Sequence, residues 1–287
     1  MTAGHSPALA AHLLRLPREL RDLIYAFVFR DLPSVPLDAV RTGLAGLALP
    51  ALHDTAALTP ELLEAFYTHA TFRVQFSDRH PSPLGRSAFP AYETHIRRLE
   101  IDAVEASLPD PLPLDALEAA CRGSPSRVRW EALLQLPRLE HLAIRLQKTA
   151  RGFCWADFSP VVVRLRERQP RPRISFSVSF DWQLEAYWNS PMWTVGGEEN
   201  EVPYEPMGFV DVTALIGPPT EEDRAYVREH NLSEQPTLSR DPCRGLIGET
   251  AAQRRVLAET YVVKEPALLR VLIMEHYEVY KRMRGEK

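Results

Sequence analysis

The sequence predicts an α/β fold, in which N-terminal helices lead into an irregular, mostly parallel, repeat-like sheet flanked by helices. Segments with alternating apolar residues, typical of strands, are interleaved with segments whose apolar residues recur at helical spacing. This alternation favours parallel strands joined by crossover helices. The chain has 25 prolines against 13 glycines, which predicts many short elements because proline ends helices. We expect a helical segment at residues 10–70 and an α/β body at residues 71–287.

The N-terminal segment is predicted to contain two helices. The first covers residues 17–29, and the apolar residues of one face are Leu20, Leu23, Ile24, Phe27 and Val28. The opposite face carries Arg18, Glu19, Arg21 and Asp22. Residues 32–57, rich in leucine, alanine and proline, are expected to form a linker that packs on the core. The second helix is predicted to begin at Thr59, because a capping threonine precedes a first-turn proline and glutamate.

The strands of the body are predicted from short alternating segments. They cover residues 71–76, 95–101, 139–144, 174–180 and 209–212, with a loop at residues 77–92. Two of them share the spacing of apolar residues found in leucine-rich repeats, namely 96, 99, 101 and 139, 142, 144. The asparagine expected three residues later is replaced by Val104 and Gln147. We therefore expect an irregular sheet and not a regular horseshoe.

Helices are predicted between and after these strands. They cover residues 114–121, 130–136, 158–168, 220–230 and 251–262, and a last helix begins at residue 266. The apolar face of the last helix consists of Leu269, Leu272, Ile273, His276, Tyr277 and Tyr280. We interpret His276 as a core histidine.

Charge and cysteine content exclude several classes of protein. The formal net charge is −4, so there is no overall drive toward nucleic acid. The cysteines, Cys121, Cys154 and Cys243, are odd in number and widely spaced, which indicates neither a zinc site nor a disulfide framework. No secretory signal or membrane span is recognisable. We expect a soluble protein of the cytoplasm or the nucleus.

No combination of residues typical of catalysis is recognisable. Phosphate-binding glycine loops, zinc-protease helices and nucleophile elbows are missing from the sequence. The adjacent His53 and Asp54 are interpreted as a solvated pair. The acidic residues around the turn near residue 197, which are Glu198, Glu199, Glu201 and Asp211, match no metal-site spacing. The sequence therefore predicts neither an enzyme nor a bound cofactor or metal.

Two further segments are candidates for binding. The arginines of residues 164–173 could contact phosphates or an acidic protein, but a solvated helix face is the favoured interpretation. Residues 181–209 are rich in aromatic side chains, which dominate binding hot spots. The target-binding candidates in this segment are Trp182, Tyr187, Trp188 and Trp193. The alternative is that these rings cover the open end of the sheet.

The first predicted helix carries a motif of five residues, Leu16, Pro17, Glu19, Leu20 and Ile24. This motif resembles the opening of an F-box, in the form common among F-box-like proteins of filamentous fungi. Similar residues of the family's second segment are Glu61, Glu64, Phe66, Tyr67 and Phe72. The resemblance implies a substrate-recognition subunit of an SCF-type ubiquitin ligase. It also implies that a Skp1-like adaptor is bound by Leu16, Pro17, Leu20 and Ile24.

The sequence leaves two interpretations of this helix open. Its surplus leucines could dock as an apolar stripe in the groove of a partner. Alternatively, they could pack on the chain's own α/β body, as the apolar faces of most amphipathic helices do. The second interpretation corresponds to a stand-alone interaction or scaffold protein that does not bind Skp1.

Overall fold

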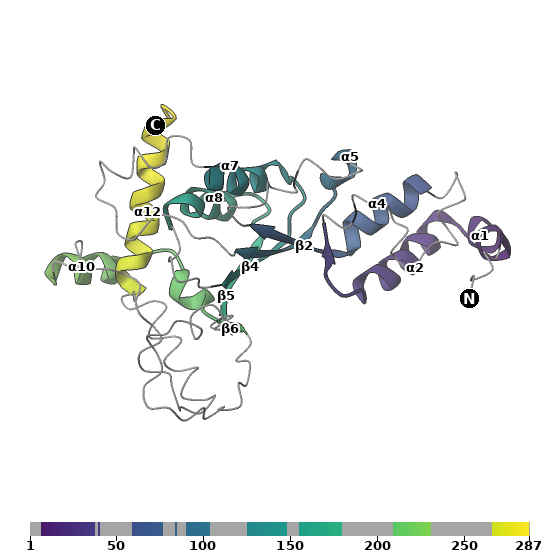
Figure 1. Ribbon diagram of the computed structural model, residues 1–287, viewed down its shortest axis with the longest axis horizontal. Helices are drawn as coiled ribbons and strands as arrows, with labels where there is room; N and C mark the ends of the chain where they lie inside the picture. The colour runs from purple at the N-terminus through teal and green to yellow at the C-terminus, as the bar shows by residue number, and fades with distance from the viewer. Residues whose placement is uncertain are drawn as a thin grey trace, which may run out of the picture.

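The computed structural model describes residues 7–37, 40, 59–76, 84, 90–103, 125–147, 155–179, 209–230 and 266–286. The predicted α/β class is confirmed, because a six-stranded sheet is flanked by helices (Figure 1). The strands follow one another in chain order, and the first five are parallel. The strands are β1 Val35–Pro36, β2 Thr71–Phe76, β3 Arg98–Ala103, β4 His141–Gln147, β5 Arg173–Ser179 and β6 Phe209–Asp211.

The predicted strands all form, and their alternation determines which side chains they bury. In β2, Phe72, Val74 and Phe76 are buried while the residues between them are not. The strand predicted at residues 95–101 begins three residues later, because His95 and Ile96 belong to the turn after the short helix α5, Pro90–Glu93. The last strand, β6, pairs antiparallel with β5.

The described part of the chain contains elements that the sequence did not predict, among them the 3-10 turn Thr213–Ile216 and helix α5, whose first residues were expected in the loop at residues 77–92. Two others lie at the N-terminal end. One is the short strand β1 inside the predicted linker, which adds to the sheet beside β2. The buried Val35, Leu37 and Val40 confirm that this part of the linker packs on the core. The other is helix α1, Pro7–Leu14, which precedes the F-box-like motif.

Helices α7, Pro125–Glu131, and α8, Trp155–Glu167, lie on the same side of the sheet (Figure 1). Rings from helices and strands meet there: Phe76 and Phe158 each contact Trp130, at centroid distances of 4.9 and 5.4 Å. The helix predicted at residues 130–136 is shifted, because α7 begins at Pro125 and Ala132–Gln135 form a 3-10 turn. The predicted helices at residues 114–121 and 251–262 lie outside the described residues.

The C-terminal elements lie at the end of the molecule opposite to the N-terminal helices (Figure 1). They are the 3-10 turn Thr213–Ile216, α10 Glu221–Glu229 and α12 Pro266–Met283. A capping box joins Thr220 and Asp223 at the start of α10, and Arg270 of α12 binds the same aspartate. Two tyrosines bind α12 to the helices on the sheet: Tyr277 donates to Glu167 at 2.8 Å and Tyr280 to Glu131 at 2.7 Å. No helix in the described part of the chain is long and apolar enough to span a membrane.

The helices α2, Arg18–Arg30, and α4, Thr59–His69, stand beside the β1–β2 edge of the sheet (Figure 1). They share one continuous core with the sheet, since Phe66 of α4 contacts Phe29 of α2 and Phe72 of β2 at centroid distances of 5.4 and 5.2 Å. The division of the chain at residue 70 stays a prediction.

The position of Phe66 leads to a stability prediction. We expect Phe66→Ala to lower the free energy of unfolding by about 3–5 kcal/mol, because it leaves a cavity between α2, α4 and β2. Urea unfolding followed by circular dichroism measures the change. The matched control is Phe27→Ala on α2, whose ring is exposed; equal losses for the two variants would contradict this packing.

Candidate partner-binding surface

Helix α2 presents an apolar surface to solvent. Its side chains are Leu20, 47% exposed, Leu23, 66%, Ile24, 38%, Phe27, 72%, and Val28, 38%. We call these five residues the α2 apolar surface. They occupy the face that the helical spacing predicts, and that face points away from the chain's own core. In this structure, the surplus apolar residues of α2 therefore remain open to another molecule.

Three of the four residues predicted to bind an adaptor are exposed, and the fourth, Leu16, is only partly exposed. Leu20 and Ile24 belong to the α2 apolar surface, and Pro17 is exposed at the N-cap of the helix. Leu16 is only partly exposed and packs against the core. The sequence-based set omitted Leu23, Phe27 and Val28, although helical spacing already placed them on the same face as Leu20.

The opposite side of α2 packs against the rest of the protein. Tyr25 and Phe29, one turn apart, are buried, with ring centroids 6.4 Å apart. Phe29 meets the ring of Phe66 edge-on, with an interplanar angle of 71°. Two large rings therefore attach the helix, while the five residues of the α2 apolar surface remain 38% to 72% exposed.

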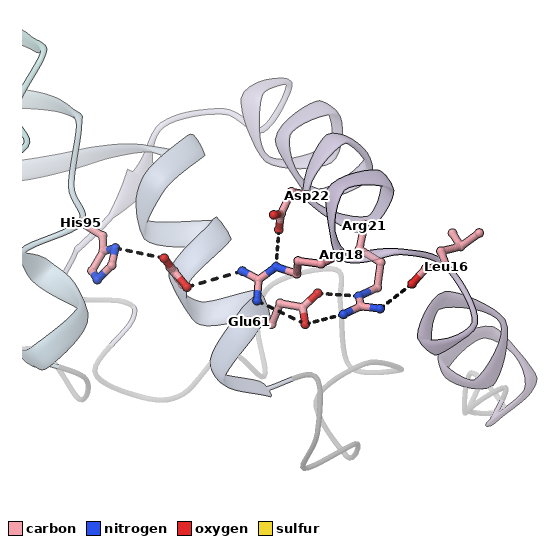
Figure 2. Close-up of polar contacts among 7 residues, drawn as sticks. Leu16, Arg18, Arg21, Asp22, Glu61 and His95 are labelled. Atoms are coloured by element: carbon pink, nitrogen blue, oxygen red, sulfur yellow. Dashed lines mark hydrogen bonds and ion pairs between the residues drawn. The ribbon is translucent and has the colours of Figure 1, made fainter.

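Polar contacts complete the attachment of α2 to α4 (Figure 2). The Nε and Nη2 atoms of Arg21 donate to the two carboxylate oxygens of Glu61, at 2.6 and 3.0 Å, and Nη1 donates to the carbonyl oxygen of Leu16 at 2.6 Å. Arg18 donates to Asp22 at 2.8 Å and forms ion pairs of 3.5 Å with Glu61 and Glu64. Arg18 and Arg21 of α2 thus face α4.

The charges of this contact stabilise one another. The hydrogen bond from Arg21 lowers the pKa of Glu61, and the same bond raises the pKa of Arg21. Burial, and then the charge of Glu61, raise the pKa of the neighbouring Tyr25. Glu61 is therefore an anion and Arg21 a cation at neutral pH, and their two-bond geometry sets the rotation of α2 about its axis.

The arginine run does not form the surface that the sequence analysis considered. Arg164 binds Glu286 and lies 5.0 Å from the ring of Tyr280, and Arg166 donates to the carbonyl oxygen of Ile216 at 2.5 Å. Arg168 donates to the carbonyl oxygen of Leu136 at 2.8 Å and to that of Leu134. The interpretation as a solvated face is wrong for Arg166 and Arg168, because their guanidinium groups donate to part-buried backbone carbonyls. The contact of Arg164 with Glu286 lies at the surface.

The remaining candidates add no site in the described part of the chain. The aromatic residues Trp182, Tyr187, Trp188 and Trp193 lie outside the described residues, as do the cysteines, the His53–Asp54 pair and the glutamates near residue 200. Asp211 accepts hydrogen bonds from the backbone and hydroxyl groups of Thr213, at 2.9 and 2.6 Å. No group of three potential metal ligands occurs among the residues that were placed.

Comparisons of the chain with protein-family models, with curated proteins and with solved structures found no match. The α2 apolar surface and the way it is held are therefore the observations on which a functional proposal depends.

The low pKa of Glu61 predicts a pH dependence. A carboxylate whose pKa is lower in the folded protein than its unfolded value of about 4.3 stabilises the fold above that value. The contribution is lost as the pH falls through the folded pKa. We therefore expect the free energy of unfolding of the wild type to fall more steeply from about pH 6 to about pH 3 than that of Glu61→Gln.

Urea titrations at several pH values measure these slopes. Glu64→Gln is the matched control, because Glu64 lies one turn further along α4 and its side chain is 46% exposed. The control should keep the wild-type slope. A Glu61→Gln slope equal to that of the wild type would show that the Arg21–Glu61 pair does not hold α2 in place.

Proposed function

We propose that the chain is an F-box-like adaptor of a cytoplasmic or nuclear SCF-type ubiquitin ligase. The α2 apolar surface binds a Skp1-like adaptor, and the α/β body binds the target protein. The chain supplies binding and positioning, requires no cofactor, and leaves the covalent chemistry to the other subunits.

The outward direction of the α2 apolar surface carries this proposal. Leu20, Leu23, Ile24 and Phe27 stand at positions i, i+3, i+4 and i+7, which is the anchor pattern of a helix that binds in an apolar groove. Contiguous apolar side chains on the surface of a folded protein are typical of interaction sites. Because α2 is attached through its other face, a partner could cover the anchors without unfolding the protein.

One observation favours the second candidate, a stand-alone interaction or scaffold protein that does not bind Skp1. Leu16, the first leucine of the F-box-like motif, is only partly exposed and packs against the chain's own core. Its carbonyl oxygen also accepts a hydrogen bond from Arg21 at 2.6 Å. In this candidate function the same apolar surface binds a different protein.

The decisive experiment measures binding of the purified chain to purified Skp1 of a filamentous fungus by calorimetry. We expect Leu23→Glu/Phe27→Glu to weaken binding at least about tenfold, because a buried interface anchor contributes about 2 kcal/mol or more. Both side chains are exposed, so the variant should fold like the wild type. Circular dichroism and thermal unfolding check this.

Val128→Glu is the matched control. Val128 is an equally exposed apolar residue, 65% exposed, and it belongs to α7 and not to α2. Its replacement should leave Skp1 binding unchanged. If the wild-type chain does not bind Skp1, the ligase proposal fails and the second candidate stands. If all variants bind Skp1 equally, the adaptor is bound elsewhere and the role of α2 is wrong.

A further inference from the structure

The edge of the sheet where β3, β4 and β5 begin is strongly basic. The connections and first residues of these strands, at residues 95–98, 137–141 and 168–173, contain six arginines and one carboxylate, Glu140. The whole chain has a formal net charge of −4, so this edge differs in sign from the protein as a whole. A local excess of one charge on a protein of the opposite sign attracts ligands of opposite charge.

Strand pairing arranges three of the basic side chains in a row. Arg98 of β3 pairs in register with His141 of β4, which pairs with Arg173 of β5. All three lie on the face opposite to the apolar residues that follow them, because successive side chains alternate across a sheet. Neighbouring strands are about 4.8 Å apart, so the row extends over about 10 Å.

Two histidines near this edge of the sheet, His69 and His95, have their pKa values lowered by burial and in part by the surrounding arginines. Burial, and then the charges of Arg30, Arg97 and Arg98, lower the pKa of His69 at the end of α4. Burial, and then Arg138, lower the pKa of His95 although Glu64 lies 3.8 Å away. Arginines from α2, β3 and the β3–β4 connection therefore contribute to one region of positive charge.

Several of these arginines are engaged within the protein. Arg97 forms an ion pair of 2.9 Å with Glu140, Arg138 contacts His95 at 2.9 Å, and Arg98 donates to the carbonyl oxygen of His69. Arg168 is held by the two carbonyl groups described above. These contacts fix the positions of the arginines at this edge. Because the edge contains more arginines than carboxylates, its net charge stays positive.

Arg171 and Arg173 are different, because both are exposed and their guanidinium groups have no hydrogen bond or ion pair with another described residue. Asp211 is close enough for Arg173 to lower its pKa, after its stronger hydrogen bonds from Thr213. We call Arg98, His141, Arg171 and Arg173 the basic edge. Arg171 and Arg173 are available to bind an anion. Arginine binds carboxylates through two parallel hydrogen bonds.

We propose that the basic edge binds an acidic segment of a partner protein. Its length of about 10 Å corresponds to about three residues of extended peptide, at about 3.3 Å per residue. A nucleic-acid binder that contacts about six to ten phosphates needs a longer surface than this row offers. The acidic remainder of the protein also repels a long polyanion. A short run of aspartates or glutamates matches the length of the row and is too short to be repelled by the acidic remainder of the protein.

This inference goes beyond the proposed function, because it concerns a different surface and requires no Skp1. The test uses the full chain and a fluorescein-labelled hexaglutamate peptide, with binding followed by fluorescence anisotropy. We expect binding that weakens as salt is added. Arg171→Glu/Arg173→Glu should weaken it at least tenfold, and the matched control Arg228→Glu/Arg282→Glu, with the same change of charge on α10 and α12, by less than twofold.

A labelled hexaglutamine peptide and a ten-nucleotide single-stranded RNA complete the experiment. Absence of hexaglutamate binding to the wild type, equal weakening by the two double variants, or tighter binding of the RNA at the same salt would each overturn the proposal. Circular dichroism checks that both variants fold. If Arg171→Glu/Arg173→Glu does not fold, Arg171→Gln/Arg173→Gln replaces it, with an expected weakening of at least threefold.

Discussion

The ion pair between Arg21 and Glu61 is the contact on which the candidate interaction surface depends. An amphipathic helix normally buries its apolar face, because removal of apolar surface from water is the main favourable term in folding. In α2, the two-bond contact of Arg21 with Glu61 and the rings of Tyr25 and Phe29 hold the other face on α4. The apolar face is then directed outward, since a helix that is attached on one side presents the other to solvent.

The same helix connects the two surfaces for which we propose functions. The α2 apolar surface occupies its outer face, and Arg30 at its C-terminal end contributes to the positive charge around His69 and Arg98. The two surfaces differ in chemistry, since one offers apolar side chains and the other guanidinium groups. In the two proposals, one partner is bound by burial of apolar area and the other by charge.

The parallel sheet and the helices on it explain how the remaining charged residues are used. Arg166 and Arg168 lie between elements, where unpaired carbonyl groups at the ends of short 3-10 turns need donors. Arginine offers five donors in a fixed plane and so can satisfy several carbonyls at once. Tyrosine hydroxyl groups also join elements. Tyr277 donates to Glu167 and Tyr280 to Glu131, and these bonds attach α12 to the helices that cover the sheet.

The periodicity of the sequence by itself determined the class of the fold, most of its strands and the identity of the apolar face of α2. These features depend on local spacing, which a single segment contains. Local spacing did not predict the strand β1, because a strand of two residues is too short to show a period. In the described part of the chain, it pairs only with β2. Only the tertiary structure decided which face of α2 points outward and which arginines remain exposed. Both depend on partners far away in the chain, such as Glu61 for Arg21 and Ile216 for Arg166, and no pattern within one segment contains them.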